Sequence, residues 1–254
     1  GRGPERGQDL GSASDHAGRI ADAAAVIRPN LESFCAVGTP GTPRPLRRPP
    51  HQSRWVRSIN RVTVGTFSYV GLRMRRSGLE HINVDGPLLI ACNHVSFVDP
   101  LVVGAAALPR LPWFMAKEEL FRGKFLGGWV HRSGGFPVRR ATPDFWAVRT
   151  ARELLERGEC LLVFPEGGVT RSGHMRPGFN GAGYLAMQAG VTVVPAIIWN
   201  TQLLRGPARV RFGPPIPMDD LRASPRAGRN RRATDRIMAT IAEMLPQGGG
   251  PVQD

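Results

Sequence analysis

The chain has 254 residues, of which 41% are hydrophobic and 21% are charged, which is ordinary for a globular protein. This length allows one sizeable hydrophobic core and excludes more than two small domains. The formal net charge of +14 attracts polyanions such as nucleic acids, phospholipid surfaces and phosphorylated substrates. A coding bias toward arginine would give the same charge, so charge alone does not choose among these partners.

Residues 1–53 are predicted to form a disordered tail. They are rich in Gly, Ala, Pro and Arg, and their stretch "TPGTPRPLRRPP" cannot form a helix or a central strand. The first thirty residues lack the apolar core of a signal peptide. We therefore expect no secretory leader in this part of the chain.

The three cysteines, Cys35, Cys92 and Cys160, stand singly and show no metal-ligand spacing, so no metal site is predicted. Cys92 and Cys160 lie in apolar runs and are predicted to be reduced, small hydrophobic residues. This use of cysteine fits a reducing compartment.

Residues 54–77 are predicted to form an amphipathic segment that associates with a membrane surface. Residues 62–72 are uncharged and mostly apolar, have arginines on both sides, and are too few to span a bilayer as a helix. Trp55 and Tyr69 would lie at the head-group level, with the arginines facing anionic lipid. The sequence is equally consistent with a helix in this segment that packs on the protein's own core.

Residues 78–246 are predicted to form one domain in which strands and helices alternate, and residues 247–254 a second disordered tail. This alternation predicts an α/β fold with a mostly parallel sheet flanked by helices. The expected strands are 87–92, 113–117, 135–138, 159–164, 191–198 and an edge strand at 208–213; the expected helices are 100–108, part of 118–134, a helix ending at Gly158, 183–189 and 234–245.

The helix that ends at Gly158 has a clear start signal. Thr142 would be its N-cap, Pro143 would lie in its first turn, and Asp144 would lie near the positive end of its dipole. Gly158 is typical of the residue that follows a helix.

His94 and Asp99 are the candidate catalytic residues. His94 follows a predicted strand, and chemistry in such sheets lies at the carboxyl ends of strands. On a regular helix the two side chains would point about 140° apart, but on a turn leading into a helix they can meet. A carboxylate bonded to one imidazole nitrogen makes the other a better base.

The helix after His94 can begin in two ways. Asp99 and Pro100 can be the N-cap and first helical residue, or Ser96 and Asp99 can form a capping box. Taken alone, this stretch favours a capping Asp99 and a loop residue His94 without a catalytic role.

Three further strand ends carry residues that could bind a substrate. Two arginines follow one strand, and their guanidinium groups can bind a phosphate. A Gly-rich loop with a carboxylate follows a second strand. A proline lies inside a third strand, which is an unusual position for a central strand. The residues are Arg139 and Arg140 in "GGFPVRR"; Glu166, Gly167, Thr170 and Arg171 in "FPEGGVTRSG"; and Pro195 in "VVPAI".

Together with "NHVSFVDP", these blocks resemble, in order and spacing, those of the 1-acyl-glycerol-3-phosphate acyltransferase family. The resemblance covers roughly residues 78–246. It implies transfer of an acyl chain from an acyl thioester to the free hydroxyl of lysophosphatidic acid, giving phosphatidic acid in phospholipid biosynthesis. The donor would be acyl-CoA or acyl carrier protein, with no cofactor and no metal. The enzyme would lie peripherally at the cytoplasmic face of the cell membrane.

The resemblance also implies a role for each site residue. His94 would be the general base, and Asp99 would orient it. Arg139 and Arg140 would hold the substrate phosphate. The remaining substrate-binding residues would be Asn93, Glu166, Gly167, Thr170 and Arg171, with Pro195 bordering the acyl region.

The third block departs from the family pattern, in which Thr-Arg-Ser directly follows Glu-Gly. Here two extra residues separate Gly167 from Thr170. Asn180 also stands where the family often has a basic residue, with Arg176 nearby. Another lysolipid or a glycerol-type acceptor is therefore an alternative.

Two interpretations from other classes are weighed against an acyltransferase. The net charge would suit a nucleic-acid-binding protein, but the sequence has no recognised binding motif and its aromatic residues are not interleaved with the basic ones. Ser96 or Ser172 could serve a hydrolase, but neither lies in a G-x-S-x-G nucleophile elbow.

Overall fold

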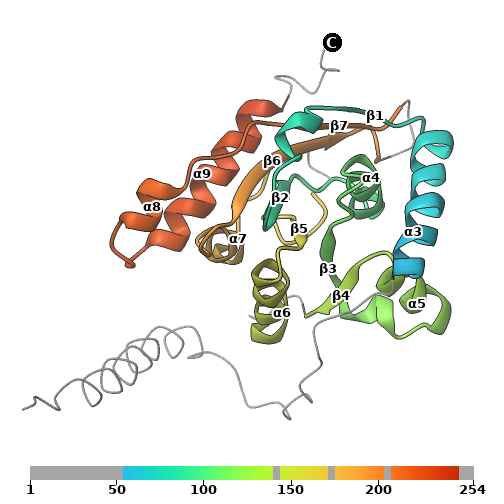
Figure 1. Cartoon of the computed structure of the whole chain (residues 1–254), viewed down its shortest axis with the longest axis horizontal. Helices are drawn as coiled ribbons and strands as arrows, with labels where there is room; N and C mark the ends of the chain where they lie inside the picture. The colour runs from blue at the N-terminus through green and yellow to red at the C-terminus, as the bar shows by residue number, and fades with distance from the viewer. Residues whose placement is uncertain (1–53, 140–143, 171–174, 203–206, 246–254) are drawn as a thin grey trace, which may run out of the picture. The chain divides into compact units, whose positions relative to one another are not determined.

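The computed structural model describes residues 54–139, 144–170, 175–202 and 207–245 (Figure 1). The predicted tails 1–53 and 247–254 lie outside these residues, as do Cys35, Thr142 and Pro143.

Seven strands of the described residues form one sheet in the order β1-β7-β6-β2-β5-β3-β4. Neighbouring strands are parallel except β6 and β7, which are antiparallel. The predicted mostly parallel α/β fold is therefore confirmed. The strands are β1 (Arg75–Ser77), β2 (Leu88–Cys92), β3 (Trp113–Lys117), β4 (Gly135–Val138), β5 (Cys160–Val163), β6 (Thr192–Trp199) and β7 (Arg209–Phe212).

The prediction that residues 208–213 form an edge strand is wrong. These residues form β7, but β1 pairs with the outer side of β7, with Arg75 opposite Arg209. All three residues of β1 are exposed, so no apolar run marks this strand in the sequence. The sheet thus begins inside the segment predicted as 54–77.

Helices cover both faces of the sheet, as Figure 1 shows. One face packs against α3, α4 and α5, and the other against α6, α7, α8 and α9. The helices are α3 (Arg54–Thr66), α4 (Asp99–Ala106), α5 (Lys124–Arg132), α6 (Phe145–Glu156), α7 (Asn180–Ala186), α8 (Asp219–Ala223) and α9 (Arg229–Met244), with a π-helix η1 (Phe67–Gly71) and 3-10 helices η2 (Leu79–His81) and η3 (Glu118–Phe121).

Strand β2 lies in the middle of the sheet and is buried on both faces. Leu88, Ile90 and Cys92 contribute to the core beneath α4, whereas Leu89 and Ala91 contribute to the core beneath α6 and α7. All five residues are buried, which explains the continuous apolar run of the sequence. The functional residues that follow β2 therefore stand on a rigid support.

Asp144 is the N-cap of α6, so the prediction that Thr142 would cap this helix is wrong. The Asp144 carboxylate accepts hydrogen bonds from the backbone N–H groups of Trp146 and Ala147, both at 3.1 Å. Gly158 follows the helix with φ of 75°, as expected of a residue that ends a helix.

Pro195 lies inside β6, where a central strand would normally need its N–H group. The Pro195 carbonyl accepts a hydrogen bond from Gly213, just after β7 ends at Phe212. A strand residue directs its nitrogen and its carbonyl to the same side. The missing N–H therefore faces Gly213, one residue beyond the end of β7, where the ladder between the two strands ends.

Helix α3 packs on the protein and also exposes apolar side chains. Val64 is buried in the core near α4, whereas Ile59 and Val62 are exposed. Among the described residues, no helix has the length and apolar character needed to cross a bilayer. Packing of this helix on the protein's own core is thus observed, whereas the membrane association of residues 54–77 stays a prediction.

Candidate active site

The carboxyl ends of four neighbouring parallel strands, β2, β5, β3 and β4, meet at one edge of the sheet. His94 follows β2, Glu166 follows β5, Glu118 follows β3 and Arg139 follows β4. The sequence blocks singled out above are brought together because parallel strands end at the same edge.

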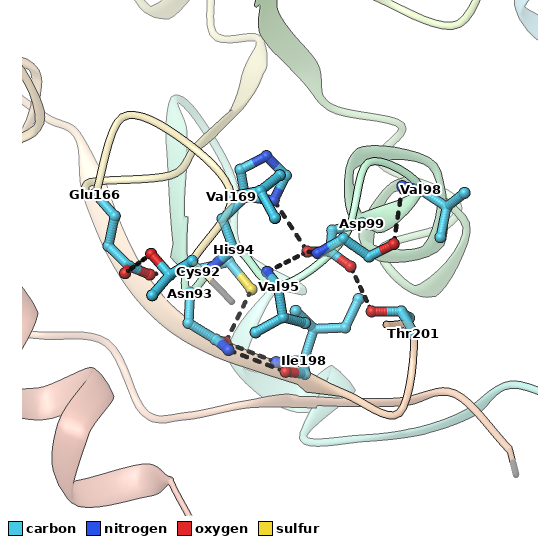
Figure 2. A network of polar contacts seen from close by, with 12 residues as sticks. Cys92, Asn93, His94, Val95, Val98, Asp99, Glu166, Val169, Ile198 and Thr201 are labelled. Atoms are coloured by element: carbon cyan, nitrogen blue, oxygen red, sulfur yellow. Dashed lines mark hydrogen bonds and ion pairs between the residues drawn. The ribbon is translucent and has the colours of Figure 1, made fainter. Parts of the chain in front are cut away.

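His94 and Asp99 form a hydrogen-bonded pair, as predicted for two residues on a turn (Figure 2). His94 Nδ1 lies 2.9 Å from Asp99 Oδ2, and both side chains are buried. Since an ionised carboxylate only accepts hydrogen bonds, Nδ1 donates to Asp99, and in the neutral form of the ring this leaves Nε2 as the unprotonated nitrogen. This is the tautomer that a general base requires.

The turn that joins β2 to α4 is built around the Asp99 carboxylate. Oδ2 also accepts the backbone N–H groups of Val95 and Ser96, each at 2.7 Å, and Oδ1 accepts the Thr201 hydroxyl at 2.6 Å. One half of the predicted capping box is present, namely the bond from the Ser96 N–H to the Asp99 carboxylate. The other half is absent, because the Ser96 hydroxyl accepts the N–H of Val98 at 3.5 Å instead of that of Asp99. The carboxylate therefore has one fixed orientation.

The imidazole of His94 stacks on Phe164, with ring centroids 4.1 Å apart. Among the described residues, Asp99 is the side chain that bonds this imidazole, and no serine hydroxyl does so. Ser172, the other candidate nucleophile, lies outside the described residues.

His94 lines a pocket of about 230 Å³ between the strand ends and helices α6 and α7. Arg139 and Asp144 supply charged groups at this pocket. Most other lining side chains are apolar, among them Met115, Val138, Leu162, Phe164, Phe179 and Leu185. Such a pocket can hold an apolar chain close to a base and a guanidinium group.

The Glu166 carboxylate holds the loops around His94 together. Oε1 accepts the backbone N–H of His94 at 3.2 Å, and Oε2 accepts the Thr170 hydroxyl at 2.6 Å and the N–H of Arg176 at 3.1 Å. The Thr170 N–H in turn donates to the His94 carbonyl at 2.7 Å. Glu166 and Thr170 thus fix the backbone of His94.

Arg176 closes the loop that the two extra residues lengthen. Its Nε donates to the Thr170 hydroxyl at 3.0 Å, and its guanidinium donates to the Gly168 carbonyl at 2.7 Å. The longer loop is therefore held by a basic side chain from the next segment.

Gly167 lines the pocket in a conformation that requires glycine. Its φ is 70°, and a Cβ at this position would lie 2.6 Å from the Phe179 ring. The glycine therefore lets Phe179 lie against the loop at the pocket wall.

Asn93 continues the ladder between β2 and β6 instead of facing the pocket (Figure 2). Its Oδ1 accepts the N–H of Ile198 at 2.8 Å, and its Nδ2 donates to the Ile198 carbonyl at 3.0 Å. Pro195 is likewise buried in β6 and does not line the pocket. The substrate-binding roles of Asn93 and Pro195 remain predictions.

Arg139 lies at the pocket with about half of its side chain exposed. Its Nε donates to Glu118 at 3.2 Å, and its backbone N–H donates to Asp144 at 2.9 Å. Arg140, predicted to hold the phosphate together with Arg139, and Arg171, predicted to bind the substrate, lie outside the described residues.

Cys92 and Cys160 are free and buried, which confirms their prediction as reduced hydrophobic residues. Burial raises the pKa of the Cys92 thiol well above its usual range, and the charges of Asp99 and Glu166 raise it further. Cys92 is therefore a neutral packing residue beside the site.

The site residues that were not assigned a role from the sequence include Thr201, Phe164, Arg176 and Glu118. Thr201 binds Asp99 across 102 positions of the sequence, so no local spacing could have revealed it. Phe164 begins the "FPEG" block, and its place at a strand end was the available signal. In the part of the chain that the structure describes, no group of three or more His, Cys, Asp or Glu residues could hold a metal ion.

Comparisons with known proteins show the family to which the chain is similar. The Acyltransferase family model matches residues 73–199. The 1-acyl-sn-glycerol-3-phosphate acyltransferase of Bacillus subtilis is 29% identical over 170 residues, which cover 65% of this chain and 84% of that protein. The enzyme of the same name from Streptococcus pneumoniae is also 29% identical, over 55% of this chain and 54% of its own length.

One relative carries a different name, and one solved structure supports the fold. The lyso-ornithine lipid O-acyltransferase of Pseudomonas aeruginosa is 36% identical over 114 residues, which cover 44% of this chain and 43% of that protein. The crystal structure of the 1-acyl-sn-glycerophosphate acyltransferase PlsC from Thermotoga maritima matches with a TM-score of 0.59 and 19% identity, covering 90% of this chain and 88% of that one.

The family model thus spans half of the chain and contains the His94–Asp99 pair, Arg139 and Glu166. The protein belongs to the acyltransferase family and is an acyltransferase.

Proposed function

We propose that this enzyme transfers an acyl chain from acyl-CoA or acyl carrier protein to the free hydroxyl of lysophosphatidic acid, forming phosphatidic acid in phospholipid biosynthesis. The observation that carries the proposal is one pocket lined both by His94, whose imidazole is hydrogen-bonded to the buried Asp99, and by Arg139. The names of the Bacillus and Streptococcus relatives support the same acceptor.

In the proposed mechanism, His94 is the general base. Its Nε2 takes the proton of the acceptor hydroxyl as that oxygen attacks the thioester carbonyl carbon. The new C–O bond forms, the C–S bond breaks, and the proton passes from His94 to the departing thiolate. A thioester is already activated, so a base and correct alignment of the two substrates are sufficient.

Asp99 assists by orienting His94. It holds the imidazole in the tautomer with Nε2 unprotonated and stabilises the imidazolium that forms when Nε2 takes the proton. The buried Asp99 side chain keeps one orientation throughout, because its oxygens are held by backbone N–H groups and Thr201.

Arg139 would bind the acceptor phosphate. In the structure Glu118 occupies its Nε at 3.2 Å, so a phosphate must displace or share this partner. A phosphate near −2 charge offers more acceptor oxygens than one carboxylate and favours a planar guanidinium. The pair is well exposed, which keeps the cost of this exchange small.

A lyso-ornithine lipid is the second candidate acceptor. The relative with that name is 36% identical over the part it matches, and the ornithine head group contains no phosphate. Glu118, beside Arg139, could pair with the amine of such a head group. This acceptor requires the same transfer chemistry at His94.

We also propose that the enzyme works at the cytoplasmic face of the cell membrane and binds there peripherally through α3 and η1. These elements expose Ile59, Val62, Phe67 and Val70, and arginines next to them would face anionic head groups. The lysolipid acceptor is itself a component of such a surface.

The proposal is tested by measuring product formation with purified full-length protein. Lysophosphatidic acid and lyso-ornithine lipid are each offered with acyl-CoA and with acyl carrier protein thioester. We expect phosphatidic acid to form with the highest kcat/KM. Higher kcat/KM for the lyso-ornithine lipid would assign the enzyme to that acceptor, and no ester formed with either would contradict both candidates.

A further inference from the structure

Helix α5 exposes an apolar face made of three side chains, Phe125, Leu126 and Trp129. Phe125 is 96% exposed, and Leu126 and Trp129 are 48% and 42% exposed. At about 100° per residue, these three positions fall within an arc of about 100° on the helix. Large apolar side chains gathered in this way mark a contact surface rather than scattered surface residues.

The α5 apolar face is held rigidly by the opposite side of the helix. Gly127 approaches η3 so closely that a Cβ would lie 2.8 Å from the Phe121 Cα, and a Cβ on Gly135 of β4 would lie 2.5 Å from Val130. Val130 is buried in the core. The close fit prevents the helix from rotating to bury its apolar face on the protein.

Charged residues around this face suit an anionic partner. Arg122 and Arg132 are exposed at the two ends of α5, and α5 itself contains no acidic residue. The acidic residues of η3 are paired, Glu118 with Arg139 and Glu119 with Lys117. The surroundings of the α5 apolar face are therefore basic.

Helix α5 also lies beside α3 and beside the pocket. Helices α3 and α5 are in contact, as Figure 1 shows. The N-terminal end of α5 follows η3, which leaves the carboxyl end of β3 and holds Glu118 against Arg139. Phe125 and Leu126 thus lie near the sheet edge that carries the site.

We propose that the α5 apolar face is a second membrane contact, which inserts into the head-group region of an anionic leaflet next to α3. This inference rests on the proposed function, since an acceptor lysolipid would be taken from that leaflet. Two contacts fix the rotation of the protein about α3, so the site edge faces the lipid. An aromatic pair flanked by arginines is typical of a segment that lies in a membrane interface.

The first test measures binding of the full chain to phosphatidylcholine vesicles with and without phosphatidylglycerol. Phe125→Ser with Trp129→Ser should lower the partition coefficient at least about tenfold, because burying even one of these side chains is worth about that factor. Phe145→Ser is the matched control, since Phe145 is 45% exposed on α6, and it should bind as the wild type does. Wild-type binding by the α5 double variant would overturn the proposal.

A second measurement leaves α5 almost intact. In a Trp55→Phe background, brominated lipid should quench tryptophan fluorescence, and Trp129→Phe should abolish that quenching. Trp146→Phe, which changes a partly exposed tryptophan of α6, should leave the quenching in place. Quenching that survives Trp129→Phe would overturn the proposal.

Failure of the inference can be told apart from failure of the proposed function. Turnover of a short-chain, water-soluble lysophosphatidic acid needs no membrane and should be the same in the α5 double variant and the wild type. Normal turnover with undiminished vesicle binding rejects only the α5 contact. Absence of turnover in the wild type rejects the proposed function.

Discussion

The Asp99 carboxylate accepts hydrogen bonds from His94, from two backbone N–H groups and from the Thr201 hydroxyl. Thr201 follows β6 and is buried, and its hydroxyl donates to Oδ1 of Asp99. It therefore fixes the plane of the carboxylate, and through Asp99 the direction of the imidazole. We assign Thr201 a positioning role.

Thr201→Val should lower kcat about tenfold and leave KM nearly unchanged. The substitution keeps the shape of the side chain but leaves a buried carboxylate oxygen without its donor, which costs about 1–3 kcal/mol. Steady-state kinetics with a fixed thioester donor measures the effect. Thr201→Ser restores the hydroxyl and should restore kcat; a Ser variant as slow as the Val variant would show that the methyl group matters instead.

Arg139→Lys should raise KM for lysophosphatidic acid several-fold and change KM for a neutral acceptor such as monoacylglycerol little. Lysine keeps the charge but loses the planar fork that binds two phosphate oxygens. Glu118→Gln is the matched control, because it frees Arg139 from its carboxylate partner and should lower KM for the phosphate-bearing acceptor. Equal losses of kcat/KM on both acceptors would mean that Arg139 supports the fold rather than binding phosphate.

Helices α7 and α9 approach each other through Gly183. A Cβ on Gly183 would lie 1.9 Å from the Asn230 carbonyl oxygen, and the Gly183 N–H donates to Thr234 at 3.0 Å. Since α7 lines the pocket and α9 covers the same face of the sheet, this contact supports the wall of the site.

Gly183→Ala should destabilise the protein by about 1–3 kcal/mol or more, because the helices would have to separate. Gly181→Ala is the matched control on the same helix: a Cβ there meets no atom within 4 Å. The control should be neutral or stabilising by about 0.5–1 kcal/mol. Urea unfolding of both variants makes the comparison, and equal stabilities would contradict this description of the α7–α9 contact.

Residues 54–77 belong to the folded domain more closely than their sequence indicates. Val64, Leu72 and Met74 are buried in the core, and β1 completes the sheet beside β7. Removal of this segment would expose the core as well as delete the proposed lipid-binding surface. Point substitutions at exposed positions such as Ile59 and Val62 therefore test membrane binding more cleanly than a truncation.

Most strands of the sheet could be predicted from apolar runs in the sequence, whereas the edge strand β1 could not. Strands 113–117 and 135–138 have the predicted bounds, since buried parallel strands are continuously apolar. The exposed strand β1 has no such signal. Helix α7 begins at Asn180, three residues before the predicted start at 183. Its first turn packs on α9 through Gly183, and a contact between segments so far apart in the chain leaves no local signal in the sequence.

The His94–Asp99 contact could be predicted because both residues lie on one short turn. The partners that complete the site, Thr201 on Asp99 and Arg176 on Thr170, come from other segments or from a loop with an unusual insertion. Asn93 illustrates the opposite case: the motif marks it, yet its side chain pairs with the backbone of Ile198. Sequence spacing locates a site but does not separate residues that touch substrate from those that support them.

The central claim is that His94 is the general base of acyl transfer, and initial rates of His94→Ala test it most directly. Asp99→Asn should cost less, because it alters the orientation of the base rather than removing it. We predict that purified His94→Ala, with a circular dichroism spectrum like that of the wild type, loses about 10²–10⁴ or more in kcat with lysophosphatidic acid and an acyl thioester. Near-wild-type turnover by a folded His94→Ala protein would contradict the account.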